Sequence, residues 1–241
     1  MIAPVASVCA FWKSSIGKKI VVAVTGLALV GFLVGHLTGN LLVFAGPVAF
    51  NDYAKFLHEL GHGAAIWVAR IGLLVFFGLH VWGTISLTIE NRKANIRDEQ
   101  ETTVQASKSS RLMIWSGLTV LAFLIFHLLQ YTVRVTDDTL HALGTGNDVY
   151  AMVIAGFQNP LVTIFYVVAL ACLFSHLSHG VASVFQTLGL RRRKTRWLID
   201  KGSTAFSALL FVGFSSIPVA ILMFGLGDKY LQQVLKAMNL A

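Results

Sequence analysis

The segment IVVAVTGLALVGFLVGHLTGNLLVFAG, residues 20–46, decides the class of this protein. It contains no Asp, Glu, Lys or Arg, and a helix of this length exceeds the roughly 30 Å of hydrocarbon in a bilayer at about 1.5 Å per residue. One imidazole, that of His36, lies within it. Because ionisable groups inside a membrane are costly, they are hypotheses for function. The segment therefore predicts a transmembrane helix whose histidine needs an explanation.

The whole chain has the composition of a membrane protein. Its 241 residues are 56% hydrophobic and 12% charged, and the mean hydropathy is +0.71, unlike a soluble domain. The first segment is too long for the apolar core of a signal peptide and is followed by no cleavage pattern, so we interpret it as a span. We predict an all-α single membrane domain over residues 1–241, with five spans at about 20–46, 66–89, 112–133, 160–186 and 204–226.

Positive charge predicts the orientation of these spans. Fourteen of the 19 Lys and Arg residues lie before the first span, between the second and third, or between the fourth and fifth. Cationic connections stay in the cytoplasm, so we expect a cytoplasmic N-terminus, an external C-terminus and a multi-pass protein of the bacterial inner membrane. The net charge of +8 does not indicate nucleic acid, because the cations are sorted by membrane side and not interleaved with exposed aromatic residues. The cluster Arg191–Arg196 also suits anionic lipid or an acidic partner.

Two further segments have the pattern of short amphipathic helices. In the 47–65 connection, Phe50, Tyr53, Leu57 and neighbouring apolar residues recur at helical spacing. The tail after Gly227 has a similar apolar side. We expect both to lie at the outer surface of the membrane.

Four of the eight histidines lie inside four different spans. Measured from the predicted cytoplasmic end of each span, His36 and His127 are both about 22–24 Å deep, and His80 and His176 are both about 14–15 Å deep. A single histidine on an apolar helix is commonly a hydrogen-bonded structural group. Two pairs at matching depths indicate ligand pairs, one joining spans 1 and 3 and the other joining spans 2 and 4.

A b-type haem is the cofactor that two facing neutral imidazoles fit best, since its iron takes one nitrogen from each side. Zinc normally requires four ligands. A transporter that relays protons through histidines normally also has membrane-embedded carboxylates, and none lies in the cores of these spans. We therefore predict two bis-histidine haems b, with these four histidines as the iron ligands. His179, one turn after His176, is an alternative ligand or a partner for a haem carboxylate.

Small residues near the histidines suit a porphyrin between helices. Gly39, Gly83 and Gly180 follow His36, His80 and His176 by three or four residues. The spacing of Gly31, Gly35 and Gly39 is equally typical of a helix-packing stripe.

Four stretches carry a resemblance to a known family. They are SSIGKKIVVAVTGLALVGFLVGHLTGNLLVFAG, FFGLHVWG, LIFHLLQY and LFSHLSHGVASVFQTLG. Together they resemble the five-helix, dihaem cytochrome b subunit that anchors succinate dehydrogenase and its fumarate-reductase relatives, over nearly the whole chain. The resemblance implies that His80 and His176 ligate the haem nearer the partner subunits, and that His36 and His127 ligate the distal haem.

The resemblance also implies partners and a quinone site. A flavoprotein subunit and an iron–sulfur subunit would dock on the cytoplasmic face, and the chain would perform no succinate chemistry by itself. A quinone, expected to be menaquinone, would bind near the distal haem. Relatives have a carboxylate near the end of the first outer loop, where His58 stands in this chain and Glu59 follows. Both are candidate quinone residues, and a polar interfacial face is the alternative.

Two other functions stay open at this stage. The chain could anchor a different membrane oxidoreductase, such as a hydrogenase or formate dehydrogenase. It could also be a haem-free, proton-coupled transporter. The direction of succinate–fumarate chemistry is not fixed by the sequence.

Overall fold

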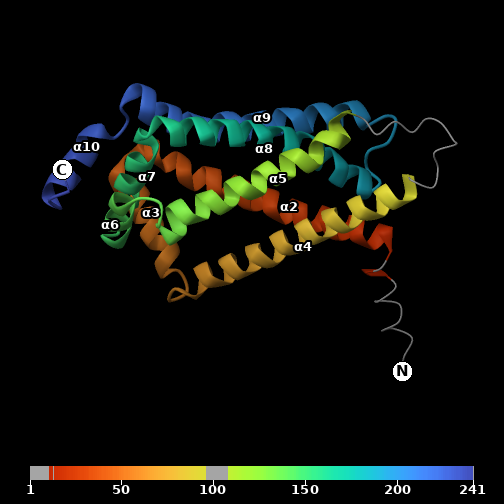
Figure 1. Ribbon diagram of the computed structural model, residues 1–241, viewed down its shortest axis with the longest axis horizontal. Coiled ribbons are helices and arrows are strands. Elements are labelled where there is room, and N and C mark those ends of the chain that lie inside the picture. The colour runs from red at the N-terminus through yellow and green to blue at the C-terminus, as the bar shows by residue number, and fades with distance from the viewer. Residues whose placement is uncertain (1–10, 13, 96–107, 241) are drawn as a thin grey trace.

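The computed structural model describes residues 11–12, 14–95 and 108–240, and the regular elements in these ranges are all helical (Figure 1). Nine α-helices and two short helical turns follow one another along them. In chain order they are α2 (Ser15–Asn40), the 3₁₀ turn η1 (Leu41–Ala45), α3 (Pro47–Glu59), α4 (Ala64–Asn95), α5 (Lys108–Leu128), the π turn η2 (Leu129–Val133), α6 (Asp138–Thr145), α7 (Val149–Gln158), α8 (Pro160–Thr187), α9 (Arg196–Phe224) and α10 (Asp228–Ala237).

Five of these helices are long and apolar enough to cross a membrane, which confirms the predicted all-α, multi-pass architecture. They are α2 with η1, α4, α5 with η2, α8 and α9. Large apolar side chains such as Ile164, Leu209 and Val212 are 57%, 68% and 63% exposed, as expected of a surface that faces lipid. Several helices run beyond the predicted apolar segments, because their polar ends continue the same backbone hydrogen bonding outside the hydrocarbon.

Local sequence signals explain where the spans begin and end. The Ser14 hydroxyl caps α2 by accepting a hydrogen bond from the Gly17 N–H. Asn159 caps α8, and Pro160 occupies its first turn, where a missing N–H costs nothing. Gly225 ends α9 in the left-handed conformation, with φ of 66°.

The five long helices form a bundle with two distinct ends (Figure 1). At the end that we call the basic end, α2 and α9 begin and α4 and α8 finish. Lys18, Lys19, Arg92 and Lys93 belong to this end, as does the connection from Arg191 to Arg196. Lys13 and Arg97, which also entered the orientation argument, lie outside the described residues.

Helix α4 is attached mainly to α2. The two helices meet near the basic end, where a β-carbon at Gly83 would stand only 2.6 Å from Val22 Cγ2 and where Lys18 pairs with Glu90. From there the helices diverge towards the other end of the bundle (Figure 1). Residues of α2, α4 and α5 all contribute to the lining of the cavity described below.

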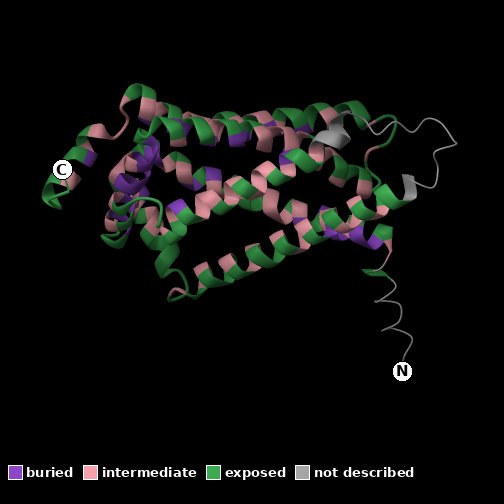
Figure 2. Ribbon diagram, in the orientation of Figure 1, coloured by how far each residue is buried: buried purple, intermediate pink, exposed green. Residues whose placement is uncertain are grey.

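The opposite end, which we call the capped end, contains the best-packed core of the described residues. Buried residues concentrate in α6 and α7 there (Figure 2). Helix α7 lies inside this end, in contact with α3, α6, α8, α9 and α10. The expected amphipathic helices are present as α3 and α10, whereas α6 and α7 were not predicted.

One carboxylate joins three helices of the capped end. Asp148 accepts hydrogen bonds from the Ala151 N–H (3.0 Å), the Asn51 amide (3.0 Å) and the Tyr230 hydroxyl (2.8 Å). It thereby caps α7 and links it to α3 and α10. Burial, together with the hydrogen bond to Asp148, raises the pKa of Tyr230 to about 12, so this tyrosine stays a neutral donor.

Candidate functional site

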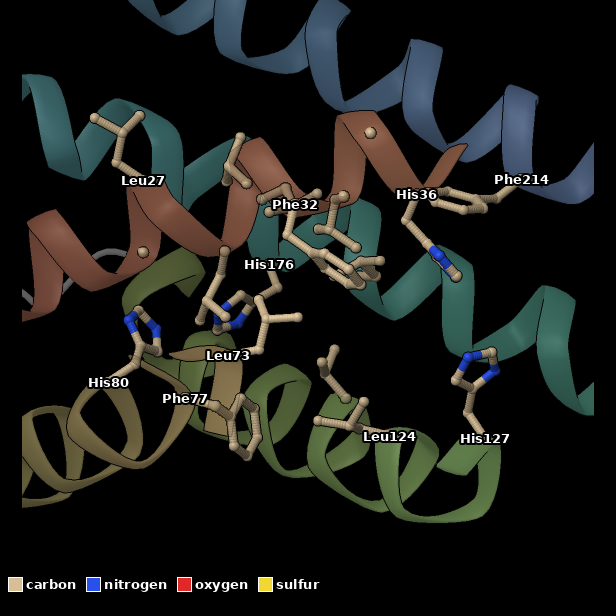
Figure 3. Close-up of a pocket in the computed structure, with 18 of the residues that line it drawn as sticks. Leu27, Phe32, His36, Leu73, Phe77, His80, Leu124, His127, His176 and Phe214 are labelled. Atoms are coloured by element: carbon tan, nitrogen blue, oxygen red, sulfur yellow. The ribbon is translucent and has the colours of Figure 1, made fainter. Parts of the chain in front are cut away.

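A cavity of about 2110 Å³ runs through the bundle and is mostly apolar. Sites for drug-sized ligands usually measure about 300–1,000 Å³, so this one has room for more than one large apolar group. All four span histidines line it. His80 and His176 lie towards one end, and His36 and His127 lie towards the other (Figure 3).

His36 on α2 and His127 on α5 face each other directly (Figure 3). Their ring centroids are 5.9 Å apart and the ring planes are inclined at 86°. Two metal–imidazole bonds of about 2 Å in line would separate two centroids by about 6 Å. The spacing therefore suits one metal ion held between the two rings. Phe32 stacks on His36 at 5.2 Å and limits the rotation of that ring.

His80 on α4 leans against α2. Its Nδ1 lies 3.2 Å from the Val22 carbonyl and 3.3 Å from the Thr25 hydroxyl. Because the Thr25 hydroxyl gives its own proton to the Val21 carbonyl, both contacts require Nδ1 of His80 to be the donor. The network thus assigns the proton to Nδ1 and leaves Nε2 as the nitrogen with a lone pair.

His176 on α8 is held in the same way by α5. Its Nδ1 lies 3.3 Å from the Ser116 hydroxyl, and that hydroxyl donates to the Met113 carbonyl. Nδ1 is again assigned as the donor. Metal-binding histidines commonly donate the hydrogen on their second nitrogen to a neighbouring acceptor, which fixes the ring. His80 and His176 both have this arrangement.

These contacts define two levels in the bundle. Thr25 and His36 are 11 residues apart on α2, and Ser116 and His127 are 11 residues apart on α5. The two levels are therefore about 16 Å apart along both helices. The sequence estimate of depth gave about 8 Å, which is too small, because α2 and α5 begin at Ser15 and Lys108, before the segment starts at residues 20 and 112 that were used for the measurement.

His127 has a more elaborate partner than the other three. Its Nδ1 lies 3.1 Å from the Tyr166 hydroxyl, which donates to Oε1 of Gln130 at 2.7 Å. Neither Tyr166 nor Gln130 attracted attention in the sequence. Asn40 lies beside His36, with its amide nitrogen 3.3 Å from Nδ1 and donating to the His36 carbonyl.

The chemistry of the lining fits a flat apolar group that carries a metal and carboxylates. Each level supplies two imidazoles, and in the part of the chain that the structure describes no cluster of three or more His, Cys, Asp or Glu could hold a metal ion by itself. Among the lining residues, Lys19 and Arg70 are cations that could meet carboxylates, and none is acidic. Gly35 and Gly180 line the cavity with no heavy atom within 4 Å of an added β-carbon.

The other glycines have different roles. A β-carbon at Gly39 would lie 2.5 Å from the ring of Tyr53 on α3, although Gly39 also borders the cavity. Gly83 lies in the α2–α4 contact and does not border the cavity. Two glycines that the sequence did not single out support the histidines, since β-carbons at Gly26 and Gly117 would stand 3.2 Å and 3.5 Å from Cε1 of His80 and His176.

The remaining candidate residues differ in whether they border the cavity. His179 is exposed and does not border the cavity, whereas His176 does. His58 borders the cavity from α3, and its Nδ1 lies 2.8 Å from the Ala54 carbonyl. Glu59 is exposed, and its Oε1 lies 3.8 Å from Nζ of Lys55. The apolar side of α3, which includes Phe50, forms part of the cavity wall at the capped end.

Comparisons of the chain with protein-family models, with curated proteins and with solved structures give no match. The structure therefore assigns a multi-pass helical membrane protein with paired histidines along one cavity.

Proposed function

We propose that this chain is the membrane-anchor cytochrome b subunit of a succinate:quinone oxidoreductase. It binds two haems b, one between His36 and His127 and the other between His80 and His176. One observation carries the proposal: imidazoles from alternate helices meet at two levels of a single large apolar cavity. The four stretches that resemble the dihaem anchor family support it.

Haem iron, when bound, supplies one-electron transfer. The residues of the chain hold and tune it. The Nδ1 contacts of His80, His127 and His176 fix the proton on one nitrogen and present the other as ligand. Most of the cavity lining is apolar, and helices satisfy their own backbone groups.

The proposal includes a quinone, partner subunits and a location. The quinone, proposed as menaquinone, is placed at the capped end, where His58 borders the cavity and Glu59 is nearby. The flavoprotein and iron–sulfur subunits dock at the basic end. That end faces the cytoplasm of a bacterium, since it contains most of the described cations. Lipid surrounds the exposed apolar faces, and fumarate reduction is the reverse use of the same assembly.

A haem count on purified variants tests the proposal. The complex as it is isolated should show a reduced b-type absorption band and two haems per chain by pyridine haemochrome. His36→Ala or His127→Ala should each remove one haem, because one imidazole is a poor holder of haem iron. His179→Ala is the matched control and should keep both haems.

Several results would contradict the proposal. Two haems in the His127→Ala protein would refute the pairing. A purified complex without any b-type band would favour a haem-free transporter. Co-purified subunits with the masses and cofactors of a hydrogenase or formate dehydrogenase would reassign the anchor to another enzyme.

A further inference from the structure

We propose that Tyr166 is a positioning residue for His127 and that, with Gln130, it raises the electron-donating strength of this ligand. The inference rests on the proposed function, because it concerns the group held between His36 and His127. It goes further by assigning a role to residues that are not ligands.

The direction of the hydrogen bonds is fixed by atom counting. A tyrosine hydroxyl has one hydrogen, and Tyr166 gives it to Oε1 of Gln130 at 2.7 Å. The hydroxyl oxygen of Tyr166 must therefore accept from Nδ1 of His127 at 3.1 Å. Tyr166 is 4% exposed and Gln130 is 2% exposed, so water does not replace either partner. The chain His127–Tyr166–Gln130 is thus a single ordered unit.

Packing holds this unit in place. The ring of Tyr166 on α8 lies edge-on between Phe123 and Phe157, with centroid distances of 4.9 Å and 4.8 Å. Gln130 lies in the π turn that directly follows α5. A π turn inserts an extra residue into the helical register and is frequent at functional sites. Gln130 follows His127 by only three residues, and its position in this turn lets its side-chain amide reach the Tyr166 hydroxyl.

The two levels of the cavity differ in this respect. His80 donates to the Val22 carbonyl and the Thr25 hydroxyl, and His176 donates to the Ser116 hydroxyl; both hydroxyls pass their own protons to carbonyls of the same helix. His127 instead donates to a phenol, whose proton passes to the side-chain amide of Gln130. Since hydrogen bonds in a chain strengthen one another, the contact with Tyr166 makes the His127 imidazole a more basic ligand than it would be without the phenol.

A basic ligand stabilises oxidised iron, so removing the Tyr166 hydroxyl should raise the midpoint potential of the haem lost in the His127→Ala protein. The test is a redox titration, followed optically, of the complex with Tyr166→Phe. The potential of that haem should rise, the affinity for it should fall about tenfold, and the other haem should titrate as in the unmodified complex.

Tyr131→Phe is the matched control. The ring of Tyr131 lies 5.6 Å from that of His127, and its hydroxyl is buried without a hydrogen-bond partner among the described residues. Tyr131→Phe removes a phenol oxygen beside His127, as Tyr166→Phe does, but it breaks no hydrogen bond. The midpoint potentials of both haems should therefore stay unchanged. Should Tyr166→Phe fail to accumulate, Gln130→Met is titrated instead, and the same haem should shift upward by a smaller amount.

The outcomes separate the two proposals. Two haems with unchanged potentials in Tyr166→Phe, or in Gln130→Met when that variant replaces it, overturn the role of Tyr166 and leave the proposed function intact. Equal shifts in Tyr166→Phe and Tyr131→Phe also overturn it, because packing alone would then explain the effect. A purified, unmodified complex that contains no haem overturns the proposed function itself.

Discussion

Two glycines allow imidazoles to reach across to a neighbouring helix. His80 lies against Gly26 and His176 lies against Gly117, each so close that a β-carbon would touch the ring. Such contacts depend on how one helix is rotated against another. For that reason the sequence identified the four histidines by their depth but gave no sign of Gly26, Thr25, Ser116 or Tyr166.

Gly26→Val should displace His80 and remove the haem that we propose it shares with His176. The valine β-carbon would stand 3.2 Å from Cε1 of His80, and the two γ-methyl groups would need additional space. The purified protein should contain one haem per chain. Gly31→Val is the matched control on the same helix, since nothing lies within 4 Å of its added β-carbon. Two haems in the Gly26→Val protein would show that His80 does not need this contact.

Hydrophobic length and periodicity predicted the five spans and the two amphipathic helices α3 and α10, but they did not predict α7. Helix α7 has only 10 residues and is apolar on nearly every side. Apolar periodicity cannot identify such a segment, because it has no polar face. Its position is set by the helices that surround it, which include α3, α8, α9 and α10.

Asp148→Ala should destabilise the capped end by about 2 kcal/mol or more, because it removes a helix cap and two further hydrogen bonds. Thermal unfolding in detergent would measure the effect. Asp137→Ala is the control, since Asp137 caps α6 through Thr139 and Leu140. That variant should cost about 1 kcal/mol. Equal losses in the two variants would mean that the links to Asn51 and Tyr230 contribute nothing.

At the scale of the whole molecule, the bundle is tightly packed at one end and opened by the cavity along its length. The odd number of spans and the sorting of charge were readable from the sequence. The cavity was not, because it depends on how several helices cross one another and not on any single segment. The separation of the two histidine levels was underestimated because α2 and α5 begin earlier than the predicted spans.

Charge reversal at the basic end should release the proposed soluble subunits. Arg191 is unsuitable for this test, because its guanidinium binds both carboxylate oxygens of Asp200 at 2.8 Å and 2.9 Å and stabilises the connection itself. The exposed residues Arg192, Arg193 and Lys194 remain. Their joint replacement by Glu should reduce co-purification of the soluble subunits at physiological salt, with the haem content unchanged.

Lys229→Glu with Lys236→Glu is the control for that experiment, since both residues lie on α10 at the far end of the bundle. Co-purification should then be unaffected. Equal loss of the soluble subunits in both proteins would attribute the effect to net charge and not to a docking surface.

The interleaving of the histidine pairs has a consequence for biosynthesis. His127 follows His36 by 91 residues, and His176 follows His80 by 96. While a ribosome is still producing the first two spans, neither pair has both members. Under the proposed function, each haem can have both of its histidine ligands only after α5, for one pair, or α8, for the other, has been inserted. If the chain binds haem as proposed, haem insertion is therefore a late step of biosynthesis, and a cell starved of haem should accumulate full-length chains without haem.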